Sequence, residues 1–181
     1  YSTDQYVAKI GTTGYKTLAE AITAANASAS PKTIILLQDV GVADQIVINN
    51  VNGQSVTLDL GKFTLTSTYT LATTSSAARY ALVNNTPLTV KNGTFAAGEA
   101  RAIGGYAKLT LNGATVTQTL TGGHACVAFC ADGATYMVNN KSVIKGAYSV
   151  SIFANNATVN ISKSTLEGTG NTLYHNGSNY G

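Results

Sequence analysis

Few side chains in this 181-residue chain could do chemistry, because only 10% of its residues are charged and eight of them are acidic. Four residues nevertheless fall near one another in the pattern described below: Tyr80, Glu99, Arg101 and His124. A tyrosine ring can stack on a sugar ring, and guanidinium and carboxylate groups can hydrogen-bond to its hydroxyls. These residue types suit saccharide recognition, provided that the fold brings them to one place.

The same set of residues argues against catalysis. Glycoside hydrolysis uses two carboxyl groups about 5 to 10 Å apart, whereas Asp59, Asp132 and Glu167 each stand alone in the pattern. A calcium site needs several carboxylates together. The two histidines, His124 and His175, are far apart in the sequence and suggest no triad. We therefore expect no catalytic residue, no metal and no cofactor.

The two cysteines, Cys126 and Cys130, are expected to be small apolar core residues. On an extended strand they would share a face, with Cα atoms about 13 Å apart at ~3.3 Å per residue. A disulfide needs Cα atoms closer than about 7 Å. The spacing is also a poor match to a zinc site.

Composition narrows the class of protein. The formal charge is +3, and the basic residues are spread singly, which argues against binding to nucleic acid or to an anionic membrane surface. No run of about 18 apolar residues is present, so no membrane insertion is expected. The surface is rich in Thr, Asn, Ser and Gly and poor in charge, which favours an extracellular or cell-surface protein.

A repeated pattern supplies the elements that must position these residues. LTVKNGTF (88–95) and LTLNGATV (109–116) share one outline of apolar and hydroxyl residues. Three apolar markers recur in each unit. The first markers are Leu60, Val90, Leu111, Val138 and Ile161; the second are Leu65, Phe95, Val116, Val143 and Leu166; the third are Leu82, Ile103, Cys130, Phe153 and Tyr174. Three short strands per unit with no intervening helix predict an all-β, right-handed parallel β-helix of about six rungs.

One segment departs from this pattern and predicts an N-terminal capping α-helix. TLAEAITAANAS (17–28) places apolar residues on one helical face, Thr17 and Glu20 match a capping box, and Pro31 follows. A solenoid needs such a cap over its first rung. We expect a single domain over 1–181, with the cap in 1–30 and the rungs in 31–181.

The opening YVAKIGTTGYKTLAEAITAANAS, followed by KTIILLQDV, resembles the start of right-handed β-helix modules in large bacterial cell-surface proteins. In those modules a small hairpin leads into a helix and then into the first strand. The resemblance covers residues 5 to 40, and beyond them it is generic to the pectate-lyase-like superfamily. It implies an adhesin-type module that belongs to a larger protein.

Rung length indicates where the candidate residues meet. The third marker precedes the next first marker by eight residues in every unit, whereas the connection from second to third marker varies between 8 and 17 residues. Two long connections, 67–80 and 118–125, flank a short one at 96–100. Insertions in solenoids gather on one face, often the binding face. We therefore predict a groove about 10 Å wide, with Glu99 and Arg101 on its floor and Tyr80 and His124 on its walls.

These features lead to one expected function and two alternatives. We expect a non-catalytic bacterial surface module that binds a polysaccharide or a host or matrix ligand. The first alternative is a structural stalk or filament segment that associates end to end. The second is a fragment of a polysaccharide lyase or hydrolase. The sequence does not identify the ligand.

Overall fold

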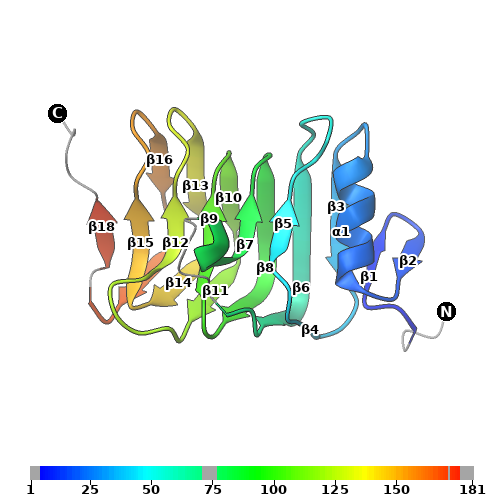
Figure 1. Cartoon of the computed structure of the whole chain (residues 1–181), viewed down its shortest axis with the longest axis horizontal. Coiled ribbons are helices and arrows are strands. Elements are labelled where there is room, and N and C mark those ends of the chain that lie inside the picture. The colour runs from blue at the N-terminus through cyan, green and yellow to red at the C-terminus, as the bar shows by residue number, and fades with distance from the viewer. Residues whose placement is uncertain (1–4, 71–76, 171, 176–181) are drawn as a thin grey trace.

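The computed structural model describes residues 5–70, 77–170 and 172–175. It shows a parallel β-solenoid of about six turns, with one short helix at its N-terminal end (Figure 1). The predicted fold class is confirmed. No helix in the described part of the chain has the length and apolarity needed to cross a bilayer.

Each turn contributes strands to three faces. The first face contains β3 (Lys32–Leu36), the first half of β6 (Val56–Ser67), the first half of β8 (Leu88–Ala97), β10 (Leu109–Asn112), β13 (Thr135–Asn139) and β16 (Thr158–Ile161). The second face contains β4 (Val40–Val42), the second halves of β6 and β8, β11 (Thr115–Gln118), β14 (Val143–Gly146) and β17 (Thr165–Gly168). Because β6 and β8 run through both faces, these two faces form one hydrogen-bonded sheet.

The third face is a separate six-stranded parallel sheet, which faces the viewer in Figure 1. It contains β5 (Ile46–Ile48), β7 (Tyr80–Asn84), β9 (Arg101–Gly105), β12 (Ala125–Phe129), β15 (Tyr148–Ile152) and β18 (Leu173–His175). The short 3₁₀ helix η2 (Ala77–Arg79) leads directly into β7.

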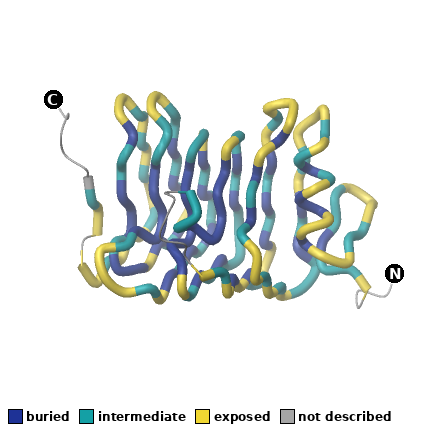
Figure 2. Tube along the Cα trace, viewed as in Figure 1, coloured by how far each residue is buried: buried dark blue, intermediate teal, exposed yellow. Residues whose placement is uncertain are grey.

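Rows of aliphatic side chains fill the interior, because each inward position stacks on its equivalents in the turns above and below. Val90 pairs with Leu58 on one side and with Leu111 on the other, and Leu111 pairs in turn with Val138. All four residues are buried. Figure 2 shows the result, in which buried segments run along the strands while exposed residues concentrate at the turns.

The N-terminal cap is confirmed. Helix α1 (Leu18–Ala27) buries one face, and its capping box is formed in both directions: Glu20 N donates to Thr17 Oγ1 at 3.2 Å, and Thr17 N donates to Glu20 Oε2 at 3.3 Å. The strands β1 (Ala8–Ile10) and β2 (Thr13–Tyr15) form a hairpin. Strand β1 also pairs antiparallel with β3, so the hairpin covers the edge of the first face.

The predicted register was wrong in the second turn of the first face. Leu58, and not Leu60, pairs with Val90. The pairing of β6 with β8 shifts between Asp59 and Thr64, where β6 carries an irregular bulge. A bulge adds residues to one strand only, so counting five residues back from Leu65 stops at Leu60, two residues short of the true partner Leu58.

The second-face marker Val143 was also wrong, since Ile144 pairs with Val116. The preceding turn contains Asn140 and Lys141, which adopt left-handed φ values of 55° and 62°. This turn holds one more residue between the two markers than the preceding unit does, and the inward position moves accordingly.

Three of the five third-face markers were wrong, because the connection that follows the third strand also varies. β10 begins soon after β9 ends, at Gly105, whereas a longer turn separates Phe129 at the end of β12 from Thr135 at the start of β13. The spacing from each third-face marker to the next first-face marker, which was assumed to be constant, is therefore longer in the later turns. The inward residues in the last three turns are Val127, Val150 and Leu173, in place of Cys130, Phe153 and Tyr174.

The two cysteines do not share a face. Cys126 is buried in the solenoid core, whereas Cys130 lies just beyond the end of β12 and packs against a second cluster outside the core. Both are free thiols. The extended strand that would have aligned them ends at Phe129.

Candidate functional site: the outer side of the third face

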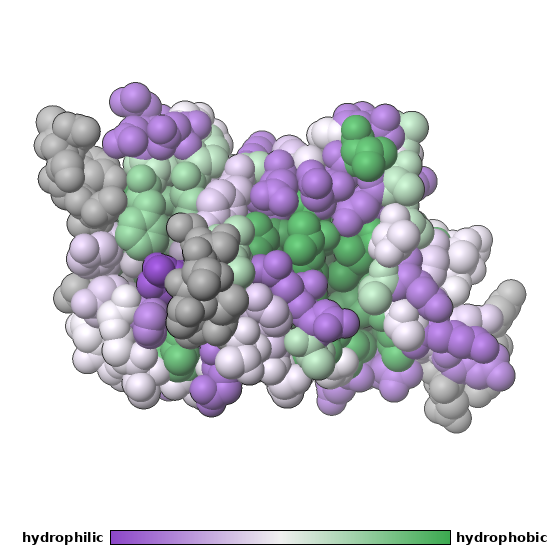
Figure 3. Space-filling model, in the orientation of Figure 1, coloured by the Kyte–Doolittle hydropathy of each residue, from purple (hydrophilic) through white to green (hydrophobic). Residues whose placement is uncertain are grey.

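A second apolar cluster lies outside the solenoid, on the outer side of the third face. It comprises buried Tyr80, Val83, Ala125 and Ala128, against which Tyr106, Cys130, Tyr148 and Phe153 pack half-buried. We call this surface, together with Arg101 and Tyr174, the aromatic face. In Figure 3 the most strongly hydrophobic side chains on this side of the molecule gather nearer to α1 than the aromatic face does, and hydrophilic ones border them. An outer surface that buries its own apolar residues is unusual for a sheet that faces water.

Small residues form the floor of the aromatic face. Register places Gly104 opposite Val83 in one neighbouring turn and opposite Ala128 in the other. A Cβ atom at Gly104 would lie 2.7 Å from Cγ of the Tyr80 ring, so the ring rests directly on the backbone there. This close approach requires glycine.

The rings above this floor contact one another along the solenoid axis. Tyr148 stacks on Tyr174 with centroids 5.4 Å apart, and Phe153 meets Tyr174 edge-on at 6.4 Å. Tyr80 and Tyr106 form an edge-to-face pair at 6.3 Å. The aromatic surface therefore extends over several consecutive turns.

Arg101 is held in the middle of this surface and is only 8% exposed. Its Nη1 donates to Tyr80 Oη at 3.3 Å, and its Nε donates to His124 Nδ1 at 3.4 Å. Its Cζ atom lies 5.7 Å from the centroid of the Tyr80 ring, within the range of a cation–π contact. Every partner of the guanidinium among the described residues is thus a neutral group.

A hollow of about 290 Å³ opens beside Arg101. Its lining comprises Arg79, Tyr80, Arg101, Tyr106, Cys130 and Phe153. Binding sites for small ligands typically start at about 300 Å³, are largely apolar, and hold a few placed polar groups. The hollow is close to this size, and its lining combines aromatic rings with the placed guanidinium groups of Arg79 and Arg101.

Burial disfavours the charged forms of the tyrosine, thiol and imidazole groups at the hollow. It raises the pKa of Tyr106 to about 12 and also raises the pKa of the Tyr80 hydroxyl and of the Cys130 thiol. The pKa of His124 is lowered, first by burial and then by the charges of Arg101 and Arg79. Near neutral pH the site therefore presents hydroxyls, a thiol, a neutral imidazole and two guanidinium groups.

The structure brings together three of the four predicted site residues. Arg101 hydrogen-bonds to both Tyr80 and His124. Glu99 is exposed in the bend between β8 and β9, and it forms no ion pair with Arg101 or any other described residue. Residues 71–76 of the predicted groove wall lie outside the described residues.

Sequence reasoning missed Tyr106 and misplaced Cys130 and Phe153. These three residues occupy equivalent positions just after the third strand in consecutive turns, where their N–H groups donate to the carbonyls of Asn84, Gly105 and Phe129. Their shared signal was a large or apolar side chain placed directly after a buried strand. Two of them were interpreted as inward markers instead.

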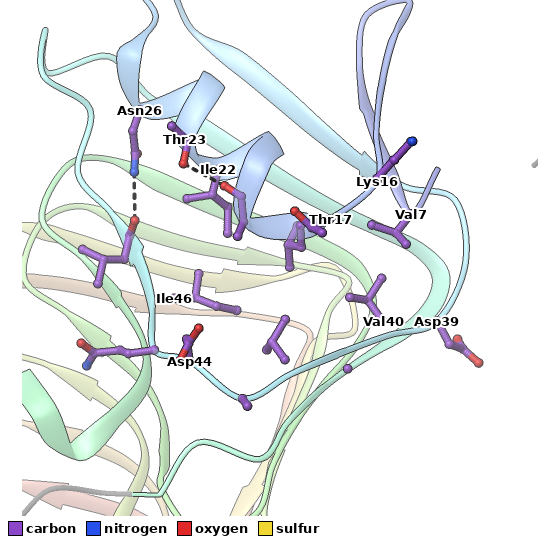
Figure 4. Close-up of a pocket in the computed structure, with 17 residues that line it drawn as sticks. Val7, Lys16, Thr17, Ile22, Thr23, Asn26, Asp39, Val40, Asp44 and Ile46 are labelled. Atoms are coloured by element: carbon purple, nitrogen blue, oxygen red, sulfur yellow. Dashed lines mark hydrogen bonds between the residues drawn. The ribbon is translucent and has the colours of Figure 1, made fainter. Parts of the chain in front are cut away.

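A second hollow, of about 540 Å³, lies between α1 and the β4–β5 segment (Figure 4). In the figure Ile22, Val40 and Ile46 point toward it, and Asp39 points away. Asp39 accepts a hydrogen bond from Thr64 N at 2.8 Å. The lining contains no aromatic residue. This hollow is best explained as the junction where the helix covers the first turn.

Among the described residues, no group of three or more His, Cys, Asp or Glu side chains is placed to hold a metal ion. Comparison of the chain with protein-family models, curated proteins and solved structures gives no match. Any role of the aromatic face is therefore argued from its geometry alone.

Proposed function

We propose that this chain is a non-catalytic module of the bacterial cell surface, of the pectate-lyase-like β-helix type found in adhesins, and that it binds a glycan on its aromatic face. One observation carries the proposal: a hollow on the outside of the solenoid combines partly exposed aromatic rings with a buried, hydrogen-bonded guanidinium.

The geometry suits a sugar ring. Tyr106 and Phe153 are half-buried, so each is anchored while part of its ring stays accessible. Apolar C–H faces of a sugar can pack on such rings, and Arg101 offers hydrogen-bond donors to its oxygens. Because both rings and the guanidinium are already held by neighbours, little side-chain freedom is lost on binding.

The absence of a reactive pair in this surface supports binding without turnover. The thiol of Cys130 has a raised pKa because it is buried, so it is a weak nucleophile. Glu99 is the acidic residue closest in sequence to Arg101, and the lining of the hollow contains neither Asp nor Glu. Glycoside hydrolysis would need two carboxyl groups there.

The test is a glycan-array screen with fluorescently labelled protein, repeated with Tyr106→Ala. A Tyr6→Ala variant serves as the control, since Tyr6 precedes the N-terminal hairpin and does not line the hollow. We expect selective binding by the wild type and the control and about a two- to tenfold loss in Tyr106→Ala, as stacking on an aromatic ring contributes about 0.5 to 1.5 kcal/mol. Equal binding by all three proteins would rule out the aromatic face.

A structural role is the second candidate, and the last turn supports it. The inner aliphatic residues Val159, Ile161 and Leu166 are only half-buried there, and Leu173 is 52% exposed. A further turn from another chain would cover them. Sedimentation velocity over a range of concentrations tests this role: concentration-dependent association that Ile161→Lys abolishes would favour it, and a monomer throughout would reject it.

A further inference from the structure

Arg101 is the one charged residue among the buried polar residues of the described chain. Burying a charge is unfavourable unless an opposite charge or a full set of hydrogen bonds compensates it. A guanidinium has five N–H donors. Three are engaged, all at long distances of 3.3–3.4 Å, and two of these three point to the same nitrogen, His124 Nδ1. The described residues therefore leave donor capacity of Arg101 unused beside the hollow.

No carboxylate of the described chain compensates this charge. The ion pairs that the described residues form are Lys91 with Asp59 and Lys145 with Glu167. Arg79 lines the same hollow and adds a second positive charge. Residues 71–76, which precede η2, read LATTSS and contain no acidic residue. The described residues thus place positive charge at a buried point without supplying its counter-ion.

We propose that the glycan bound by the aromatic face carries an oxyanion, a carboxylate or a sulfate ester, which pairs with the free donors of Arg101 while Tyr106 and Phe153 hold the sugar ring. This inference rests on the proposed function and specifies the chemical class of its ligand. The planar fork of a guanidinium matches two oxygens of a carboxylate or sulfate, and such charge-assisted pairs are stronger than neutral hydrogen bonds. Arg79 would add long-range attraction for the same group.

The experiment compares three matched oligosaccharides by isothermal titration calorimetry: one carboxylated, the same molecule reduced to its neutral alcohol, and a sulfated analogue. We expect the wild-type chain to bind at least one acidic form at least about tenfold more tightly than the neutral form, since hydrogen bonds to charged groups contribute about 1.5 to 3 kcal/mol. The carboxylated and sulfated arms identify which oxyanion is preferred. Acidic and neutral forms that bind equally would overturn the inference.

Variants assign the preference to Arg101. Arg101→Met should abolish the preference for the acidic form, and Arg101→Lys should weaken it by retaining the charge without the planar fork. Lys145→Met is the matched control, because it removes one positive charge from an exposed ion pair outside the hollow. If Arg101→Met fails to fold, the comparison of Arg101→Lys with the wild type still tests whether Arg101 sets the preference for the acidic form. A preference that survives in Arg101→Lys unchanged would overturn the assignment to Arg101.

The failure of this inference can be told from the failure of the proposed function. Equal binding of acidic and neutral sugars, both weakened by Tyr106→Ala, would leave glycan binding in place and reject the oxyanion. Conversely, acetate or sulfate could protect Cys130 from alkylation in the wild type and not in Arg101→Lys, with no glycan binding. That result would retain an oxyanion site and reject the glycan. Neither glycan binding nor protection would reject both.

Discussion

The inner and outer sides of the third face differ in how much residue type varies from turn to turn, although alternate residues of the same strands form them. The inner row reads Leu82, Ile103, Val127 and Val150, so each of these four turns supplies a buried aliphatic side chain. The adjacent outer row reads Val83, Gly104, Ala128 and Ser151, with a different residue type in each turn.

The difference has a physical cause. An inward side chain must fill the space between its own equivalents above and below, which favours similar shapes in every turn. An outward side chain meets no such requirement, so its type is free to serve a purpose. On the aromatic face, small residues at Gly104 and Ala128 lie beneath large rings such as Tyr80. Equivalent outer positions can therefore differ from turn to turn, which lets small residues and large rings lie side by side on this surface.

Leu111→Ala should produce the largest effect. Leu111 is fully buried in the inner row of the first face, and large-to-small changes in such positions lower the free energy of unfolding by about 2 to 5 kcal/mol. Urea unfolding followed by circular dichroism measures the loss. Thr110→Ala, one residue away on the outer side, is the control and should change stability by less than about 0.5 kcal/mol. Similar losses in both variants would erase the distinction between inner and outer rows.

Gly104→Ala should affect the aromatic face more than the fold. The added Cβ would lie 2.7 Å from the Tyr80 ring, so the ring must move and its contacts with Arg101 must change. We expect a loss of stability of about 1 to 3 kcal/mol from overpacking, together with lost binding of whichever glycan the wild type selects. Gly41→Ala is the control, because a Cβ there meets nothing within 4 Å. Unchanged glycan binding in Gly104→Ala would separate the Tyr80 ring from the site.

His124 should make stability depend on pH. Its pKa in the folded chain is lowered by burial and by the two nearby arginines, so the unfolded chain binds the proton more readily. The folded chain therefore loses stability as the pH falls below about 6.5, the ordinary pKa of histidine. The melting temperature of the wild type should fall more between about pH 7.5 and about pH 5.5 than that of His124→Gln. Parallel curves for the two proteins would contradict this.

The smallest perturbation is chemical labelling of the two thiols. Cys126 is buried in the core and Cys130 is only half-buried at the hollow, although burial raises the pKa of both. Iodoacetamide should modify Cys130 slowly at neutral pH and modify Cys126 only after unfolding. Peptide mass spectrometry after timed quenching distinguishes them. Equal protection of both thiols until the chain unfolds would contradict the position of Cys130 at the hollow.

Some features of the aromatic face follow from local sequence and others do not. The loop lengths around 67–80 and 118–125 led to Tyr80, Arg101 and His124, which do lie in contact. The same reasoning placed Glu99 on the floor of the predicted groove, whereas Glu99 is exposed in a bend and does not line the hollow. Side-chain direction within a bend depends on backbone torsions that spacing does not reveal.

The sequence by itself determined the parallel solenoid, its approximate number of turns and the capping box at Thr17, since each follows from a local pattern that stacking or capping requires. Only the tertiary structure decided which residues face outward after β9, β12 and β15. A bulge in β6 or an extra residue in a turn shifts the inward set without changing the pattern. Tyr106, Cys130 and Phe153 come together around Arg101 because three turns align those ends across the sheet.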